Sequence, residues 1–215
     1  MFASLDRFFD TVVAVAEDRA TRVGGMSIHA WAFLVMLSVA AMLPGLASVP
    51  VMDRDEARYS QASRQMLETG DFVDIRFQDV PRHVKPAGTY WLQAASAWVA
   101  GGPEAAKIWA YRLPSFLAAL GAVLVTAWLG ARIGGGATGL IAGSLMAVSL
   151  ILSVEARTAK TDALLLLSVV VAQAALWRVL EREGASRFKG APLVFWLAHG
   201  AGVMIKGPII TLVLG

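Results

Sequence analysis

The sequence predicts an all-α polytopic membrane protein with about five transmembrane helices and a large loop after the first of them. Composition is the first observation, since 57% of the residues are hydrophobic and only 16% are charged, far from the average of soluble domains. The second is a series of apolar runs, each close to the roughly 20 residues that a transmembrane helix needs. The runs are residues 28–51, 113–131, 137–154, 163–180 and 192–215.

The third observation is the distribution of positive charge between these runs. Short cytoplasmic loops carry an excess of Lys and Arg, and basic residues gather here before the first run, after the second and after the fourth. We therefore expect the N-terminus in the cytoplasm, and residues 52–112 and 155–162 on the opposite side. The basic residues are Arg7, Arg19, Arg22, Arg132, Arg178, Arg182, Arg187 and Lys189.

Residues 1–24 are predicted to form a cytoplasmic amphipathic segment. Apolar side chains recur there at helical spacing, and the acidic residues among them argue against a signal peptide. A helix on the membrane surface is favoured, with a disordered tail as the alternative. The apolar positions are Leu5, Phe8, Phe9, Val12, Val13 and Ala16.

Residues 25–215 are expected to form the N-terminal part of a transmembrane domain, with 52–112 as its first outer loop. The expectation of a longer protein comes from the fifth run, which is still apolar at Gly215. The sequence contains no Cys, which excludes disulfides and thiolate metal sites. Its net charge of +3 gives no indication of a nucleic-acid-binding surface.

Two helices are predicted in this loop. Asp53 or Asp55 is placed to cap a helix that ends just before Gly70, which supplies a left-handed stop. The next segment, 71–82, lacks a sustained period and predicts irregular structure. A second helix, 89–99, is too short to span a bilayer and contains aromatic rings, so it should lie flat on the outer leaflet.

Charged residues from separate parts of the sequence fall on the predicted outer side, near the ends of the apolar runs. Lys206 is the most informative, because it lies inside the fifth run, where a lysine costs about 2.5–3.5 kcal/mol unless it reaches a partner or water. A carboxylate that can accept a proton, beside cations that can neutralise a phosphate, suits group transfer from a lipid-phosphate donor. The set is Asp55, Arg58, Lys85, Glu155, Arg157, Lys160, Asp162 and Lys206.

Several of these residues also have a purely structural interpretation. Lys206 can extend its ammonium to the lipid headgroups, and Asp162 can cap the fourth apolar helix. Asp55 can pair with the arginine three residues later on its own helix. Glu155 and Arg157 can form a solvated pair.

No metal cluster is predicted from the residues. His83 is the only histidine of the large loop, and no second His or Cys lies near it, so a metal site there would lack ligands. His29 and His199 are isolated in apolar runs and are interpreted as histidines of the helical bundle.

A set of short motifs, in this order along the chain, resembles the bacterial polyprenyl-phosphate-dependent C-type glycosyltransferases. That family includes the lipid A aminoarabinose transferase and is distantly related to the protein O-mannosyltransferases. The resemblance covers about residues 52–208, and its specificity lies in the combination, since each piece is short. The motifs are Asp53-Arg54-Asp55-Glu56-Ala57-Arg58-Tyr59, Met66-Leu67-Glu68-Thr69-Gly70-Asp71-Phe72, Lys85-Pro86, Tyr90-Trp91-Leu92, Tyr111-Arg112-Leu113-Pro114-Ser115, Lys160-Thr161-Asp162 and Lys206-Gly207-Pro208.

The resemblance implies a glycosyltransferase of the bacterial inner membrane whose active site is periplasmic, beneath a first loop that carries two membrane-parallel helices. Asp55 matches the catalytic base of the family. No cofactor is predicted, and a divalent metal is left open. The resemblance further implies that Arg58, Lys85 and Lys206 bind the donor phosphate and that Tyr59, Asp162 and Glu56 line the cavity.

The sugar and the acceptor are not assigned by the sequence. Aminoarabinose transferases tend to have an acidic residue just before the Lys-Pro pair and a second Pro after it, whereas Val84 and Ala87 stand here. We expect a polyprenyl-phosphate-linked sugar as donor and a lipid, glycan or protein as acceptor, with inversion at the anomeric carbon. The modified product would be lipopolysaccharide or another glycan.

Two other classes of function are weighed against this one. A secondary transporter or lipid flippase would have internal repeats and charges near the membrane midplane, but the sequence has no evident repeat and its charges favour one side. A noncatalytic scaffold would not need charged residues gathered on one face of the membrane.

Overall fold

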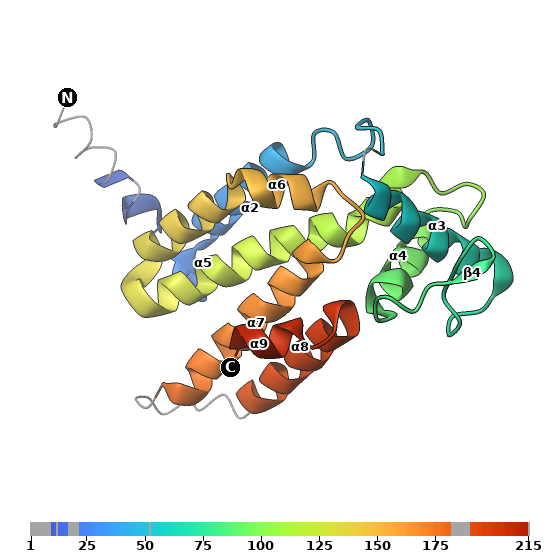
Figure 1. Ribbon diagram of the computed structural model, residues 1–215. Coiled ribbons are helices and arrows are strands. Elements are labelled where there is room, and N and C mark those ends of the chain that lie inside the picture. Colours follow the sequence, from blue (N-terminus) through green and yellow to red (C-terminus); the bar gives the residue numbers. More distant parts are fainter. Residues whose placement is uncertain (1–9, 12, 17–21, 52, 182–189, 215) are drawn as a thin grey trace.

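The secondary structure is almost entirely helical in the computed structural model, which describes residues 10–11, 13–16, 22–51, 53–181 and 190–214. The strands among the described residues are limited to two short antiparallel pairs, and all other elements are helices. The predicted all-α fold is therefore confirmed. A bundle of apolar helices fills one end of the molecule and a smaller helical cap lies at the other (Figure 1). The strand pairs are β1 (Arg22–Val23) with β2 (Met26–Ser27) and β3 (Arg76–Phe77) with β4 (Val80–Pro81).

The bundle contains the helices that the apolar runs predict. Among the described residues, α5 and α7 are long and apolar enough to cross a membrane, and α2 and α8 are apolar but shorter. The most extensive contacts of α7 are with α5 and α8, so α7 lies between them in the bundle. The helices are α2 (Ile28–Met42), α5 (Ile108–Ala147), α6 (Leu150–Ala156), α7 (Asp162–Leu180), α8 (Ala191–Lys206) and α9 (Ile209–Leu214).

Helix α5 consists of two antiparallel arms that meet at Gly135. This glycine has φ 87° and ψ 173°, a conformation that residues with a Cβ rarely adopt. The second arm folds back onto the first, and a Cβ placed on Gly139 would lie only 2.5 Å from the carbonyl oxygen of Ala127. The arms correspond to the second and third apolar runs, which are therefore separate helices as predicted. The third run is broken once more between Ala147 and α6.

The first and fifth apolar runs are each interrupted as helices. Helix α2 ends at Met42 because Pro44 cannot continue it, and Gly45, at φ 90°, turns the chain away. The fifth run is divided at Gly207, which has φ 72° and ψ −150°, and α9 folds back on α8. His199 Nε2 lies 3.0 Å from the hydroxyl of Thr211 across this turn. One continuous helix over residues 28–51 is therefore wrong, whereas the break after Lys206 is the one that the Gly207-Pro208 pair predicts.

A proline near the start of α5 is accommodated by a hydrogen bond from α4 (Gly88–Val99), a helix of the smaller helical cap. Pro114 lies inside the helix and has no N–H to donate to the carbonyl of Ala110, four residues earlier. Ser96, on α4, donates its hydroxyl to that carbonyl at 2.6 Å. The free acceptor is thus satisfied by a helix of the cap, which ties the cap to the bundle.

The cap is built from α3 (Arg54–Thr69) and α4, with the hairpin of β3 and β4 between them. Asp53 caps α3 by accepting from the N–H of Asp55 at 2.7 Å, and Gly70 ends it at φ 71°, as the sequence predicts. The ring centroids of Tyr59 and Tyr90 lie 5.1 Å apart where the two helices pack.

The predicted amphipathic segment at the N-terminus is described only in part. Residues 10–11 and 13–16 are helical, and Ala16 is buried against the bundle. The hydroxyl of Ser27 donates to the carbonyl of Val15 and accepts from the N–H of Ala30 at 3.1 Å as the cap of α2. The predicted positions Leu5, Phe8, Phe9 and Val12 lie outside the described residues.

Candidate active site

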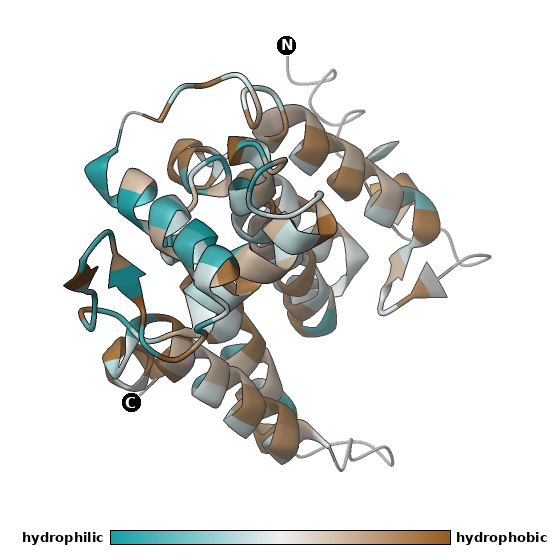
Figure 2. Ribbon diagram, turned by 90° about the vertical axis from the view of Figure 1, so that its right-hand side faces the viewer, coloured by the Kyte–Doolittle hydropathy of each residue, from teal (hydrophilic) through white to brown (hydrophobic). Residues whose placement is uncertain are grey.

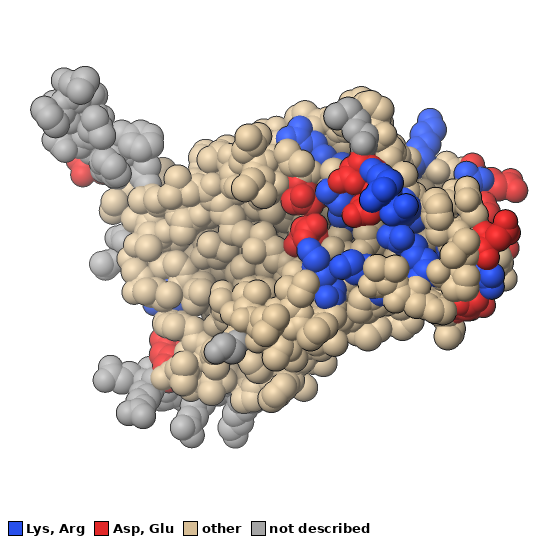
Figure 3. All heavy atoms as spheres, in the orientation of Figure 1, with Lys and Arg blue, Asp and Glu red and all other residues tan. Residues whose placement is uncertain are grey.

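Charged side chains gather at the end of the molecule where the cap meets the bundle. Figure 3 shows Lys, Arg, Asp and Glu side by side on this end, while the bundle surface in the same view is largely uncharged. Viewed from this end, hydrophilic residues follow one helix of the cap and the hairpin beside it (Figure 2). The charged residues that the sequence singles out therefore fall at one end of the fold.

The centre of this end is a buried ion pair between α3 and α5. Arg112 donates from Nε and Nη2 to the carboxylate of Glu56, at 2.7 and 3.1 Å, and both side chains are at most 2% exposed. Arg112 Nη1 also donates to the carbonyl oxygens of Leu46 and Val49, at 2.9 and 2.8 Å. Glu56 accepts from the N–H of Ala159 at 2.9 Å. Four separate segments are thus joined by one pair.

A second ion pair, nearer the surface, links the start of α3 to the segment before α7. Lys160 Nζ lies 2.7 Å from Asp53 and 3.9 Å from Glu155. The hydrogen bond from Lys160, with a further one from the N–H of Asp55, lowers the pKa of Asp53. Burial raises the pKa of Glu155, and Lys160 offsets part of that rise. The ammonium of Lys160 holds its proton more tightly, because the hydrogen bond to Asp53 raises its pKa despite burial.

Lys206 forms an ion pair with Asp162 across the interface of α7 and α8. The structure therefore gives the intramembrane lysine a carboxylate partner. Asp162 is not the residue that caps α7, since Thr161 occupies that position and no side-chain hydrogen bond caps the helix. Arg157 donates to the carbonyls of Ser153 and Pro44, at 2.8 and 3.0 Å, rather than to Glu155, so the predicted solvated pair is wrong.

Asp55, Arg58 and Tyr59 occupy one face of the first turns of α3. Arg58 lies 3.9 Å from Asp55, whose side chain is 59% exposed, so the carboxylate is open to solvent. Tyr59 is buried against Tyr90. Burial raises the pKa of both phenols, and the charge of Asp55 contributes to both rises. The predicted base thus lies within electrostatic range of the two rings.

Lys85 is half-buried in the segment that leads into α4. The start of α4 packs closely against the end of α8, because a Cβ on Gly88 would lie 2.6 Å from the carbonyl oxygen of Met204. Lys85 and Lys206 are therefore each only two or three residues from this contact. The predicted cations come from segments that meet at one place.

A cavity of about 670 Å³ opens beside these pairs. Glu56 and Arg112 form its inner wall, and Asp53 and Lys160 stand at its rim. A smaller space of about 290 Å³ is lined by Glu155 and Asp162 together with apolar residues. The other residues of the larger cavity are Val49, Pro50, Arg54, Val154, Arg157 and Thr158.

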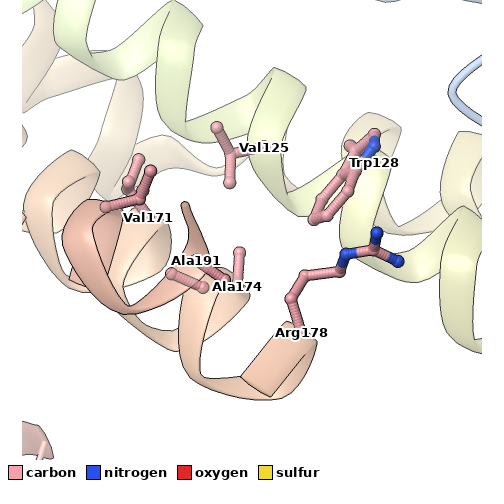
Figure 4. Close-up of a pocket in the computed structure, with 8 residues that line it drawn as sticks. Val125, Trp128, Val171, Ala174, Arg178 and Ala191 are labelled. Atoms are coloured by element: carbon pink, nitrogen blue, oxygen red, sulfur yellow. The ribbon is translucent and has the colours of Figure 1, made fainter. Parts of the chain in front are cut away.

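A pocket of a different character lies at the other end of α7. It is apolar, measures about 340 Å³ and is lined by Val125, Trp128 and Val171. Among the described residues that line it, the charged one is Arg178, which points along the wall toward Trp128 (Figure 4) and is paired with Glu181 at 2.8 Å. The described lining offers no carboxylate, hydroxyl or histidine, so we do not assign the active site to this pocket.

Sequence reasoning missed the pairing of Arg112 with Glu56 and of Lys160 with Asp53. A signal for the first was present, because Arg112 stands at the edge of an apolar run, where a charge needs a partner. Among the described residues, no group of three or more His, Asp or Glu side chains is arranged to hold a metal ion.

The fold and the polar cavity at one end define a polytopic, all-helical membrane protein. The chain belongs to the dolichyl-phosphate-mannose-protein mannosyltransferase family, whose model matches residues 27–215. It is 31% identical over 178 residues to the undecaprenyl phosphate-alpha-4-amino-4-deoxy-L-arabinose arabinosyl transferase of Yersinia pestis (strain Pestoides F), covering 82% of this chain and 31% of that protein. The counterpart in Edwardsiella ictaluri is 26% identical, with 84% and 32% covered.

The fold is similar to that of ArnT from Cupriavidus metallidurans. The apo structure of that protein matches with a TM-score of 0.76 and 22% identity, covering 84% of this chain and 33% of that one. Its structure bound to undecaprenyl phosphate matches with a TM-score of 0.72, covering 86% and 34%. The chain spans about a third of the length of the relatives it matches.

Proposed function

We propose that the protein containing this chain is an inner-membrane glycosyltransferase that transfers a sugar from a polyprenyl-phosphate donor. The acceptor is a hydroxyl group of a lipid, a glycan or a protein, and the reaction takes place on the periplasmic side. The observation that carries the proposal is the meeting of four segments at one end of an apolar bundle. They are α3 with Asp55 and Arg58, the segment of Lys85 that leads into α4, and α7 and α8 with the pair of Asp162 and Lys206. Membership of the family, and the similarity to transferases named for an undecaprenyl-phosphate-linked sugar, support the same donor class.

The proposed reaction is a single displacement at the anomeric carbon. Asp55 accepts the proton of the acceptor hydroxyl as its oxygen forms the new bond to that carbon. The bond between the anomeric carbon and the phosphate oxygen breaks, and its electron pair leaves with polyprenyl phosphate. One displacement inverts the anomeric configuration. Asp55 suits the role of base, because its carboxylate is open to solvent at the end of the molecule where the donor would bind.

Arg58, Lys85 and Lys206 are proposed to bind the donor phosphate. This charge increases as the sugar leaves, so the cations stabilise the transition state more than the bound donor. Lys206 is paired with Asp162 and Arg58 approaches Asp55 in this structure, so phosphate binding exchanges these partners. Lys85 has no ion pair among the described residues. Tyr59 and Asp162 are proposed to border the reacting groups, and Glu56 to hold the wall behind them.

The test is sugar transfer from a radiolabelled polyprenyl-phosphate sugar by the full-length protein in membranes. Asp55→Asn should lower turnover by about a hundred- to ten-thousand-fold, the usual contribution of a general base. Asp79→Asn is the matched control, because Asp79 is an exposed acid on the hairpin of the same cap and should leave turnover unchanged. Normal turnover in Asp55→Asn would remove Asp55 from the mechanism.

The same assay separates the transferase from a lipid flippase. A flippase moves the labelled lipid across the membrane with the bond between sugar and phosphate intact. Translocation without release of polyprenyl phosphate would therefore contradict the proposed function as a whole.

A further inference from the structure

Arg82 is a half-buried cation that no carboxylate neutralises among the described residues. Its Nε donates to the hydroxyl of Tyr90 at 2.9 Å, and its guanidinium carbon lies 5.4 Å from the centre of the Tyr59 ring. Its backbone N–H donates to Ile75 at 2.7 Å. The terminal nitrogens Nη1 and Nη2 have no hydrogen-bond partner in the part of the chain that the structure describes.

This arrangement differs from that of three other cations at the same end. Lys160, Lys206 and Arg112 each have a carboxylate partner. A partly buried charge without a counterion is costly, and stacking on an aromatic ring offsets only part of such a cost. Arg82 is therefore fixed in place with its charge still unbalanced.

The position of Arg82 relates it to the candidate site. The ring beneath it belongs to Tyr59, which shares a face of α3 with Asp55 and Arg58. The charge of Asp55 reaches both tyrosines that hold Arg82. Lys85, which also has no ion pair among the described residues, follows three residues later in the chain. Arg82 thus lies over a ring that shares a helix face with the proposed base.

The geometry of the guanidinium suits a phosphate. Because Nε is occupied by Tyr90 and one face lies over Tyr59, the two Nη groups are the donors that remain. Two parallel N–H groups from an arginine can bind two oxygens of one phosphate, which a lysine cannot do.

We propose that Arg82 is a further residue that binds the donor phosphate, with its Nη groups donating to the non-bridging oxygens beside Lys85. The proposal rests on the proposed function and adds a residue that it does not include. Tyr90 acts as a positioning residue, because its hydroxyl accepts from Nε of Arg82 and so fixes the orientation of the guanidinium. Arg82 and Lys85 would bind the phosphate of the bound donor, and would bind it more strongly as negative charge develops on the phosphate in the transition state.

The experiment measures initial rates against donor concentration for the full-length protein. Arg82→Met keeps an apolar side chain over Tyr59 and removes the donors, and we expect it to raise the donor KM roughly tenfold to a hundredfold, with a fall in kcat. Arg82→Lys should recover only part of this loss, and Tyr90→Phe should show a smaller change in the same direction. Polyprenyl phosphate should also inhibit Arg82→Met more weakly as a product.

The matched control is Arg76→Met. Arg76 is an exposed arginine on the same hairpin, paired with Asp74 at 3.1 Å, and its substitution should leave the donor KM unchanged. A purely structural role for Arg82 would lower the amount of folded protein in Arg82→Lys and Tyr90→Phe without changing the donor KM of the folded fraction, and this result would overturn the proposal.

The outcomes separate this proposal from the proposed function. If Lys85→Ala raises the donor KM and Arg82→Met behaves like Arg76→Met, Arg82 is not a phosphate-binding residue and the transferase remains. If the unmodified protein neither uses the polyprenyl-phosphate donor nor is inhibited by polyprenyl phosphate, the proposed function fails and this proposal fails with it.

Discussion

Two kinds of ion pair stand within one end of this molecule, and they differ in how much of their hydrogen-bonding capacity is used. Arg112 and Glu56 are 1% and 2% exposed and bind three further backbone groups. Lys160 and Asp53 are 19% and 42% exposed, and Lys206 and Asp162 are 23% and 41% exposed. The first pair is fully committed to the fold. The other two have capacity left for a ligand.

The difference shows which charges can take part in chemistry. A buried pair whose donors and acceptors are all satisfied cannot turn to a substrate without leaving an uncompensated charge. A half-exposed pair can exchange its partner, because water compensates the group that is released. The charged end therefore combines a rigid support with a changeable rim, and substitutions should affect the two in different ways.

Breaking the buried pair should have the largest effect. Arg112→Met leaves Glu56 buried without its cation, and we expect the free energy of unfolding to fall by about 3–5 kcal/mol. The measurement is thermal or denaturant unfolding of the full-length protein in detergent. Arg64→Met is the control, because Arg64 and Glu68 form an exposed pair on α3, and it should leave the melting temperature unchanged.

The double variant Glu56→Leu with Arg112→Met sharpens this test. Replacing both charges by apolar groups removes the uncompensated charge, so much of the lost stability should return. A double variant as unstable as Arg112→Met alone would mean that the hydrogen bonds to Leu46, Val49 and Ala159 matter more than the charges.

Removing Lys160 from the rim should have a smaller effect. Lys160→Met takes away the partner of Asp53 and the cation nearest to Glu155, and the expected loss is about 1 kcal/mol, since the carboxylates can still reach water. Because Lys160 lowers the pKa of Glu155, that pKa should also rise in the variant. Unfolding of the variant is followed between pH 4 and 8. The loss of stability is compared with that of Arg112→Met, and the dependence of stability on pH reports the change in the pKa of Glu155. A loss as large as that of Arg112→Met would contradict the division into support and rim.

The smallest expected effect is the pH dependence of the stability that Asp53 contributes through its pair with Lys160. The pKa of Asp53 is lower in the folded protein, so its ionised form stabilises the fold above the pKa of the unfolded chain, near 3.8. This contribution should be lost as the pH falls through the lower folded value. Asp53→Asn keeps a residue that caps helices well and removes the charge, so it should cost less than about 1 kcal/mol at neutral pH.

The pH series on Asp53→Asn has a definite pattern. Its stability difference from the unmodified protein should be constant well above the unfolded pKa near 3.8 and should shrink toward zero as the pH falls through the lower folded pKa. A difference that stays constant through this range would assign the effect to the shape of the side chain at the cap of α3 rather than to its charge.

Much of the fold follows from local patterns in the sequence. The apolar runs predict the helices of the bundle, Asp53 and Gly70 predict the ends of α3, and the glycines around Gly135 separate the second run from the third. The length of the first helix was less well predicted, because hydropathy does not register that Pro44 and Gly45 stop a helix, whereas Gly207-Pro208 marks the break in the fifth run.

The sequence by itself determined which residues are apolar enough for the bundle, where the cap helices begin and end, and that acids and cations follow the ends of the runs. Only the tertiary structure decided their partners. Glu56 meets Arg112 across 56 positions, and Asp53 meets Lys160 across 107. The physical reason is that helical periodicity records which side of a helix is buried, while an ion pair depends on how distant helices cross, which no local pattern contains.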